Sequence, residues 1–246
     1  MPVRSPFTGP PKERVIEPYR GTLPEELLLL AHDPVTGRTL ARSPYIGYGV
    51  AGAVLAELDR AGRIGEDGGR FRVLEPAPVG VPKLDWVLDV LGRTGAGSGR
   101  GIGARGWIRD SGRHLVELYV RGLVDCEALR AEKRRMLGVF PYLRYPVGTV
   151  DRTTPVRERV DAAARSGQAD AGTRLLGALA AATGIDEELY PGFSARHLRR
   201  ALDGFAHAEW TAGTVQRLVE KDESAHRSKP AGIGGSRGGR SMGGDD

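Results

Sequence analysis

Apolar residues recur at helical spacing through much of the chain. Between Tyr48 and Ala61 they fall three and four residues apart, which predicts an amphipathic helix with one face in a core. Gly62 follows at the position where helices commonly end in a left-handed residue. The apolar positions that define this helix are Val50, Ala51, Val54, Leu55 and Leu58.

Further helices are predicted on both sides of this segment. Thr22 to Glu25 has the form of a capping box, in which each of these two side chains accepts the amide of the other residue. A helix therefore begins here, and it ends by Asp33-Pro34. Ser194 is the predicted N-cap of a late helix with a buried stripe. The other helices are predicted over residues 84–91, about 108–121, 155–165, 171–183, 194–208 and 209–221.

Two β-hairpins are predicted between the helices. The first joins residues 63–64 to 70–74 through a glycine-rich turn that tolerates positive φ. The second is inferred because the pattern that ends at Gly62 is echoed at Gly122, which predicts another helix end there and a return strand over 136–140. Convergent capping explains the echo better than a duplication. The resulting fold class is mainly α: a single helical domain with two β-hairpins.

Both ends of the chain differ in composition from this helical domain. Residues 1–20 contain five prolines and scattered charges, and residues 223–246 are rich in Gly, Ser and Arg, so both are predicted to be disordered. The folded domain is expected over residues 21–222. Its longest apolar run, Leu27 to Ala31, is far shorter than the ~20 residues that cross a bilayer. The N-terminus has no apolar signal-peptide region, so neither membrane spanning nor secretion is expected.

The charge of the chain points to anionic partners. Lys and Arg number 36 against 31 Asp and Glu, which gives a formal net charge of +5. Most of the basic residues are arginines, whose planar guanidinium can hold a phosphate through two parallel hydrogen bonds. Arginine abundance can also reflect the base composition of a gene. Net charge alone does not distinguish nucleic acid from acidic lipid.

The sequence gives little indication of catalysis. Gly101, Gly103 and Gly106 match the spacing of a dinucleotide fingerprint, but no strand precedes them and no βαβ unit follows, so they predict a loop. The five histidines are separated from one another and from Cys126, the single cysteine. We therefore predict no catalytic residues, no metal site, no cofactor and no enzyme activity.

Arg109 and Arg113 are the strongest candidates for phosphate contact. They lie one helical turn apart, and Arg100 and Arg105 precede them in the glycine-rich segment. Two guanidinium groups on one helix face form a phosphate clamp if they converge. A solvated charged face is the commoner explanation of such a pair.

Longer stretches of the chain resemble the Golgi phosphoprotein 3 family. The resemblance begins with TLPEELLLLA from Thr22 and continues with GVAGAVLAELDRAGRI, which spans Gly49 to Ile64. It extends through LYVRGLV at Leu118 and through residues 137–140, 144–146, 175–184 and 199–218. It thus covers nearly all of residues 21–222.

This resemblance implies packed central helices ringed by amphipathic helices and hairpins, in a peripheral membrane protein that binds phosphatidylinositol 4-phosphate. Eukaryotic members act at the cytoplasmic face of Golgi membranes, where they retain glycosyltransferases and bridge to coat proteins. Their head-group pocket uses a Trp, an Arg in a Gly-Leu-Arg-Gly segment and two later Arg. Here Arg42 and Tyr45 occupy the loop that carries the Trp, Ala51 replaces the Arg, and Arg109 and Arg113 match the later pair approximately.

The resemblance also implies a hairpin that takes part in self-association and membrane contact. It would run from Gly122 to Phe140 and carry Lys133, Arg134 and Arg135. Aromatic and basic residues together suit a membrane interface. Packing of this hairpin into the core is an equal alternative.

Two other functions compete with lipid binding. A winged-helix nucleic-acid binder would place residues 54–74 as a helix followed by an arginine-bearing wing, and the basic charge fits it. The upstream residues 33–47 are turn-rich and lack the preceding helix, so nucleic acid is not the expected partner. A protein-interaction scaffold without lipid binding, with the Arg/Gly tail contacting acidic partners or RNA, is the third hypothesis.

Overall fold

The computed structural model describes residues 15–16, 21–95, 100–136, 140–206 and 209–227. Most of the predicted disordered N-terminal segment, and the tail from residue 228, lie outside the described residues. The helices are α1 (Leu23–Leu30), α2 (Tyr45–Arg60), α3 (Pro82–Gly95), α4 (Ala104–Asp125), α5 (Thr153–Ser166), α6 (Ala171–Ala182), α7 (Ile185–Leu189), α8 (Arg196–Ala206) and α9 (Trp210–Arg227). The strands are β1 (Val15–Ile16), β2 (Ile64–Asp67), β3 (Arg70–Val73), β4 (Ile102–Gly103), β5 (Glu132–Met136), β6 (Phe140–Arg144) and β7 (Val150–Asp151).

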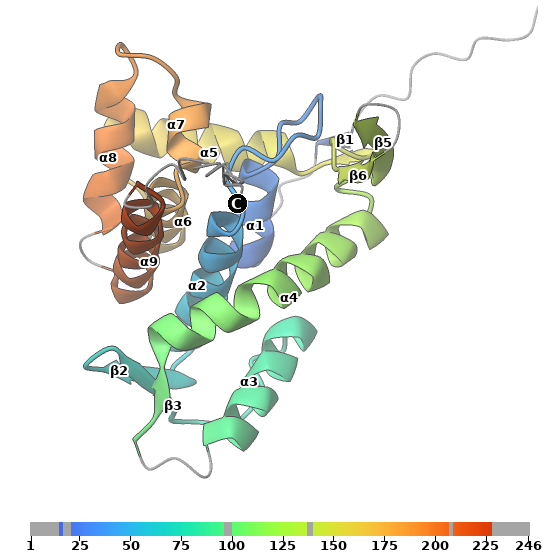
Figure 1. The fold of residues 1–246 in the computed structure, drawn as a ribbon. Coiled ribbons are helices and arrows are strands. Elements are labelled where there is room, and N and C mark those ends of the chain that lie inside the picture. Colours follow the sequence, from blue (N-terminus) through green and yellow to red (C-terminus); the bar gives the residue numbers. More distant parts are fainter. Residues whose placement is uncertain (1–14, 17–20, 96–99, 137–139, 207–208, 228–246) are drawn as a thin grey trace, which may run out of the picture.

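Helix α2 lies at the centre of the molecule, between α1, α4, α6 and α9 (Figure 1). Its glycines let neighbouring helices approach closely. A Cβ atom on Gly52 would lie 2.6 Å from Cγ2 of Val215 in α9. Where α4 crosses α2, backbone meets backbone, because a Cβ on Gly112 would lie 2.7 Å from the carbonyl carbon and oxygen of Gly47. This close packing buries nearly the whole of α2.

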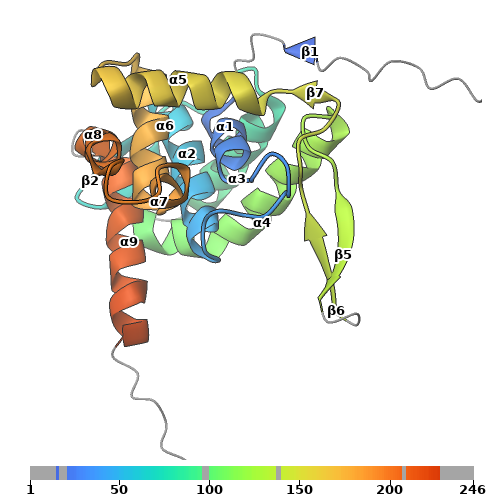
Figure 2. The same cartoon turned by 90° about the horizontal axis from the view of Figure 1, so that it is seen from above.

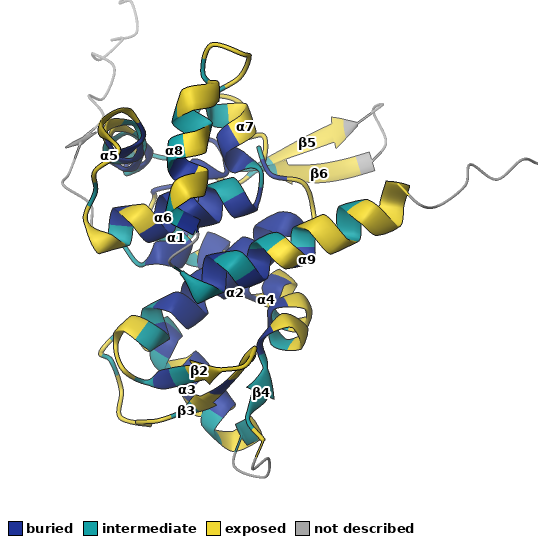
Figure 3. Cartoon of the chain, turned by 90° about the vertical axis from the view of Figure 1, so that its left-hand side faces the viewer, coloured by how far each residue is buried: buried dark blue, intermediate teal, exposed yellow. Residues whose placement is uncertain are grey.

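Around this centre, the outer helices bury one side and expose the other, as Figure 3 shows for α5, α8 and α9. Helix α1 is almost fully buried, and the carboxylate of Glu25 accepts the Thr22 amide at 3.2 Å, as the predicted capping box requires. The predicted fold class, one mainly α domain with two β-hairpins, is confirmed. In the part of the chain that the structure describes, every helix is too short or too polar to cross a bilayer.

The first predicted hairpin is confirmed as β2–β3. Ile64 pairs with Val73 and Asp67 with Arg70, around a turn in which Gly68 and Gly69 have φ of +59° and +80°. Positive φ at both central residues gives the turn whose twist matches a hairpin. The short strand β4 adds to β3 in an antiparallel sense and was not expected, because the sequence predicted only a loop there.

The second hairpin forms, but its predicted start at Gly122 is wrong. Helix α4 continues through Gly122 to Asp125, and the hairpin comprises β5 and β6. Gly122 instead lies beneath the Lys83 side chain, because a Cβ there would lie 2.1 Å from Nζ of Lys83. Beyond the helix, the left-handed residue is Glu127, with φ of +57°.

Several predicted boundaries also shift. Helix α8 begins at Arg196, so Ser194 is not adjacent to its first residue, and α9 extends past residue 222 to Arg227. The short helix α7 follows Gly184, whose φ is +73°. Residues Val15–Ile16 form β1, which pairs in parallel with β7.

Candidate anion-binding site at the start of helix α2

The crossing of α2 and α4 places both predicted arginines of α4 beside the first turn of α2. Arg109 and Arg113 flank Gly112, the residue that touches Gly47. With Ser43, Pro44 and Tyr48 they line a cavity of about 270 Å³. Both arginines are exposed, with 45% and 87% of their side-chain surfaces accessible, so their guanidinium groups can reach a bound anion.

A second cavity also has Ser43 and Pro44 in its wall. It has a volume of about 390 Å³ and is lined by Arg42, Tyr45, Glu223, His226 and Arg227 together with those two residues. Arg42, His226 and Arg227 are exposed. His226 and Arg227 lie in the last turn of α9, which the sequence interpretation assigned to the disordered tail because of its composition.

Carboxylates partly balance the charge of this region. Asp222 accepts a hydrogen bond from the Tyr48 hydroxyl at 2.7 Å and lies 3.8 Å from the Arg109 guanidinium. Burial, together with this bond to Asp222, raises the pKa of the Tyr48 hydroxyl. Arg113 pairs with Glu117 one turn later at 3.2 Å. Exposed ion pairs of this kind contribute only about 0–1 kcal/mol, so a phosphate can compete with them.

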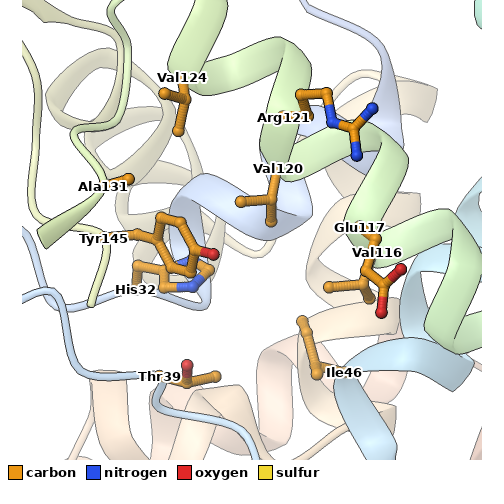
Figure 4. Close-up of a pocket in the computed structure, with 10 residues that line it drawn as sticks. All are labelled: His32, Thr39, Ile46, Val116, Glu117, Val120, Arg121, Val124, Ala131 and Tyr145. Atoms are coloured by element: carbon orange, nitrogen blue, oxygen red, sulfur yellow. The ribbon is translucent and has the colours of Figure 1, made fainter. Parts of the chain in front are cut away.

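A third cavity, of about 430 Å³, lies beside the first and is shown in Figure 4. Ile46, Val116 and Glu117 line both cavities. Figure 4 shows Val116, Val120 and Val124 along α4 on one side, with Tyr145 and His32 on another. No local pattern of residues indicates this cavity, because its walls come from segments far apart in the chain.

His32 is held rigidly at the wall of this third cavity. It is 4% exposed, and its Nδ1 donates to the Leu28 carbonyl at 2.7 Å. Its ring meets the Tyr145 ring edge-on at 5.6 Å. Burial lowers the pKa of the imidazole, so the ring is neutral and the wall carries no charge at this point.

Comparison with models of known protein families matches residues 23–221 to Golgi phosphoprotein 3 (GPP34). The chain belongs to the GPP34 family. This family is associated with lipid binding. The match covers the helical body and every lining residue of the cavity at Arg109 and Arg113, while the second cavity also includes Glu223, His226 and Arg227 beyond residue 221. A comparison with proteins of curated description gave no match.

The GPP34 resemblance named four head-group residues, and the structure brings them to the two cavities that share Ser43 and Pro44. Arg109 and Arg113 line one cavity, and Arg42 and Tyr45 line the other. Tyr45 is only 7% exposed and packs against Tyr48 at a ring distance of 6.2 Å, so it mainly supports the start of α2. Ala51, which replaces an arginine of the GPP34 pattern, is fully buried.

The other basic residues that were named with Arg109 and Arg113, Arg100 and Arg105, precede them in the chain. Arg105 is not in a loop but in the first turn of α4, where it is exposed. The backbone carbonyl of Arg100 accepts a hydrogen bond from Nε of Arg70 in β3 at 2.5 Å. Neither residue lines the cavities beside Pro44.

The hairpin expected for a GPP34 member is largely exposed. Lys133, Arg134 and Arg135 are accessible, as are Tyr142 and Leu143 on the opposite strand, with 38% and 50% exposure. The alternative that these residues pack into the core is therefore wrong. Phe140 pairs with Met136 through its backbone, and the placement of its side chain lies outside the description.

Arg134 and the preceding Arg130 both contact the Glu132 carboxylate, at 2.6 and 2.5 Å. Figure 2 shows the hairpin and the C-terminal part of α9 projecting to the same side of the helical body, with the loop into α2 between them. The hairpin and the two cavities beside Pro44 thus belong to one side of the molecule.

Proposed function

We propose that this chain is a non-catalytic peripheral membrane protein that binds phosphate groups of anionic lipids, phosphatidylinositol 4-phosphate among them. The observation that carries the proposal is the gathering of Arg42, Arg109, Arg113 and Arg227 around Ser43 and Pro44. These side chains come from three separate parts of the chain, so their convergence is a product of the fold. We call the two cavities that they line the head-group site.

The hairpin supports the same orientation toward a membrane. Its basic residues and its exposed Tyr142 and Leu143 project to the side on which the head-group site lies (Figure 2). Aromatic and aliphatic side chains enter the interface between head groups and acyl chains, while basic residues near an anionic bilayer contribute about 1 kcal/mol each. Several such contacts acting together give useful affinity although each is weak.

The remaining parts of the proposal come from family membership. As an adaptor, the chain would act at the cytoplasmic face of a membrane, the Golgi membrane in eukaryotic relatives, and hold client proteins there. The β5–β6 hairpin would also serve self-association. Its edges are free of other described strands, which suits pairing with a second copy.

A nucleic-acid function has weaker support. The helix and hairpin that would form a winged helix lie inside the region matched to GPP34. The wing residue Arg70 uses its guanidinium to hold the backbone carbonyls of Arg100 and Gly101, both at 2.5 Å. That guanidinium is therefore already committed within the molecule.

Liposome co-sedimentation tests the proposal directly. The chain is mixed with neutral vesicles, vesicles containing phosphatidylserine and vesicles containing phosphatidylinositol 4-phosphate, and separately with duplex DNA, at low and high salt. We expect binding to both anionic vesicles that weakens with salt, because the attraction is electrostatic. Binding to DNA with no binding to any vesicle would refute a lipid function.

A paired charge reversal locates the site. Arg109→Glu with Arg113→Glu should lower vesicle binding at least tenfold, since two favourable charges become two repulsive ones, at about 1 kcal/mol per charge. The matched control is Arg93→Glu with Arg165→Glu. These arginines are similarly exposed, 74% and 69%, and form ion pairs with carboxylates one turn earlier.

Both double variants carry the same net charge and should unfold at nearly the temperature of the parent chain. If they weaken vesicle binding equally, overall charge rather than the head-group site controls binding. If only the first variant loses folded structure, Arg109 and Arg113 are structural residues.

A further inference from the structure

We infer that the cavity in Figure 4 holds one acyl chain of the lipid whose phosphate lies at Arg109 and Arg113. This inference rests on the proposed function and deepens it. The protein would not only touch a head group at the surface but draw one chain out of the bilayer and along α4. The ligand class is thus an anionic lipid with an accessible acyl chain.

The position of the two cavities is the first argument. Ile46, Val116 and Glu117 belong to the walls of both, so the cavity at Arg113 adjoins the larger one. Their common wall is α4, whose segment from Arg113 to Val124 is about 16 Å long at ~1.5 Å per residue. Half of a ~30 Å hydrocarbon core, about 15 Å, is the reach of one acyl chain. We call the two adjoining cavities together the groove. The groove and one acyl chain therefore match in length.

The chemistry of the walls is the second argument. Val116, Val120 and Val124 recur at one-turn spacing on α4 and form an apolar stripe along the cavity. Ile46 and Tyr145 add apolar surface from α2 and from the segment after β6. Covering such a surface with hydrocarbon instead of water lowers the free energy of the system.

The distribution of charge is the third argument. Arg109 and Arg113 line only the smaller cavity, and the neutral His32 lines only the larger one. Glu117 lines both cavities and Arg121 lines the larger one, and both are exposed, which suits a rim that stays in water while the valines face the acyl chain. A molecule with an anionic group at one end and hydrocarbon at the other fits this order.

A series of alkyl phosphates tests the groove without a membrane. The full chain is titrated calorimetrically with ethyl, butyl, octyl and dodecyl phosphate, each below its micelle concentration. We expect the affinity to rise about two- to fourfold per added methylene until the groove is filled, the range expected for partial to complete burial of each CH₂. An affinity that is independent of chain length would overturn the inference.

Filling the groove supplies the decisive comparison. Val120→Trp should remove most of the dependence on chain length while leaving ethyl phosphate binding unchanged, because Val120 lines only the larger cavity. Val124→Phe, at a partly exposed position, serves the same purpose if the tryptophan variant does not fold. The control is Val90→Phe on α3, at a position with 37% exposure outside both cavities.

The outcomes separate the two proposals. If the parent chain sediments with anionic vesicles but shows no dependence on chain length, the groove inference fails and the head-group site stands. If the affinity depends on chain length to the same extent in the parent protein, in Val120→Trp and in Val124→Phe, the alkyl chain binds elsewhere and the inference fails. If neither vesicles nor alkyl phosphates bind, the proposed function itself is wrong.

Discussion

The contact between α2 and α4 makes a sharp prediction about Gly112. In Gly112→Ala, the new methyl group would lie 2.7 Å from the carbonyl carbon and oxygen of Gly47 and 3.1 Å from its Cα. Carbon atoms pack favourably at about 3.5–4.0 Å, so the two helices would have to separate by nearly 1 Å. Because both partners are backbone atoms, no side chain can rotate away to make room.

The expected loss combines two opposing terms. Overpacking of a tight core costs about 1–3 kcal/mol, while replacing glycine by alanine inside a helix gains up to about 1 kcal/mol. The net loss is then up to about 2 kcal/mol in the free energy of unfolding. For a domain of this size that corresponds to a fall of up to roughly 8 °C in melting temperature.

The assay is thermal unfolding followed by circular dichroism, with Gly106→Ala as the internal control. Gly106 lies in the first turn of the same helix, and a Cβ there would meet nothing within 4 Å. This control should gain a few tenths of a kcal/mol, since it keeps the benefit in helix propensity without the clash. If Gly112→Ala is as stable as Gly106→Ala, the close backbone contact does not exist in solution.

Two further predictions concern carboxylates. Glu117→Gln releases Arg113 from its ion pair and removes one negative charge from the rim of the groove. Binding to anionic vesicles in co-sedimentation should therefore tighten about fivefold, the equivalent of ~1 kcal/mol per charge. Unchanged or weaker binding would argue against a phosphate near Arg113. Burial raises the pKa of Asp186 from 3.8 to about 6, so the folded state binds the proton of this carboxyl more tightly than the unfolded state does. Proton binding at Asp186 therefore stabilises the fold fully below pH 3.8, and this stabilisation is lost as the pH rises through 6. Denaturant unfolding at pH 4 and pH 7 should therefore show Asp186→Asn gaining about 1–3 kcal/mol relative to the parent chain only at the higher pH, and a constant difference would mean that Asp186 titrates normally.

Local signals in the sequence predicted local structure well. Thr22 and Glu25 are three residues apart, so their capping interaction needs no other part of the chain, and the Glu25 carboxylate accepts the Thr22 amide as predicted. Gly62 is likewise a left-handed residue, two positions after the last residue of α2, with φ of +67°. Each of these features depends on backbone geometry that nearby residues determine.

The same local signal was wrong at Gly122, where α4 continues to Asp125. Its sequence context resembles that of Gly62, but Lys83 from α3 lies over this point of α4, above the Tyr119 ring at 5.0 Å, and pairs with Glu25 of α1 at 2.8 Å. The glycine makes room for that side chain and leaves the helix intact. A pattern within one segment cannot reveal such a neighbour.

In the candidate site, too, local spacing predicted some features, while others depend on how the helices pack. The spacing of Arg109 and Arg113 predicted that they would be neighbours on one helix, and they are. That Arg42 and Arg227 would join them could not be predicted from spacing, because it depends on how α2, α4 and α9 cross. The third cavity is invisible in the sequence for the same reason, since Tyr145 and Val120 meet only in the folded chain.

The crossing of α2 and α4 ties the stability of the fold to the position of the proposed site. Gly47 and Gly112 let the helices touch, and the same contact holds Arg109 and Arg113 beside Pro44. Charge changes at the exposed arginines should therefore alter binding with little effect on folding. A change at Gly112 should alter both, because it moves the helix that carries the charges. Substitutions at the exposed arginines and at Gly112 thus distinguish a binding site that depends on helix packing from surface charges whose position does not depend on it.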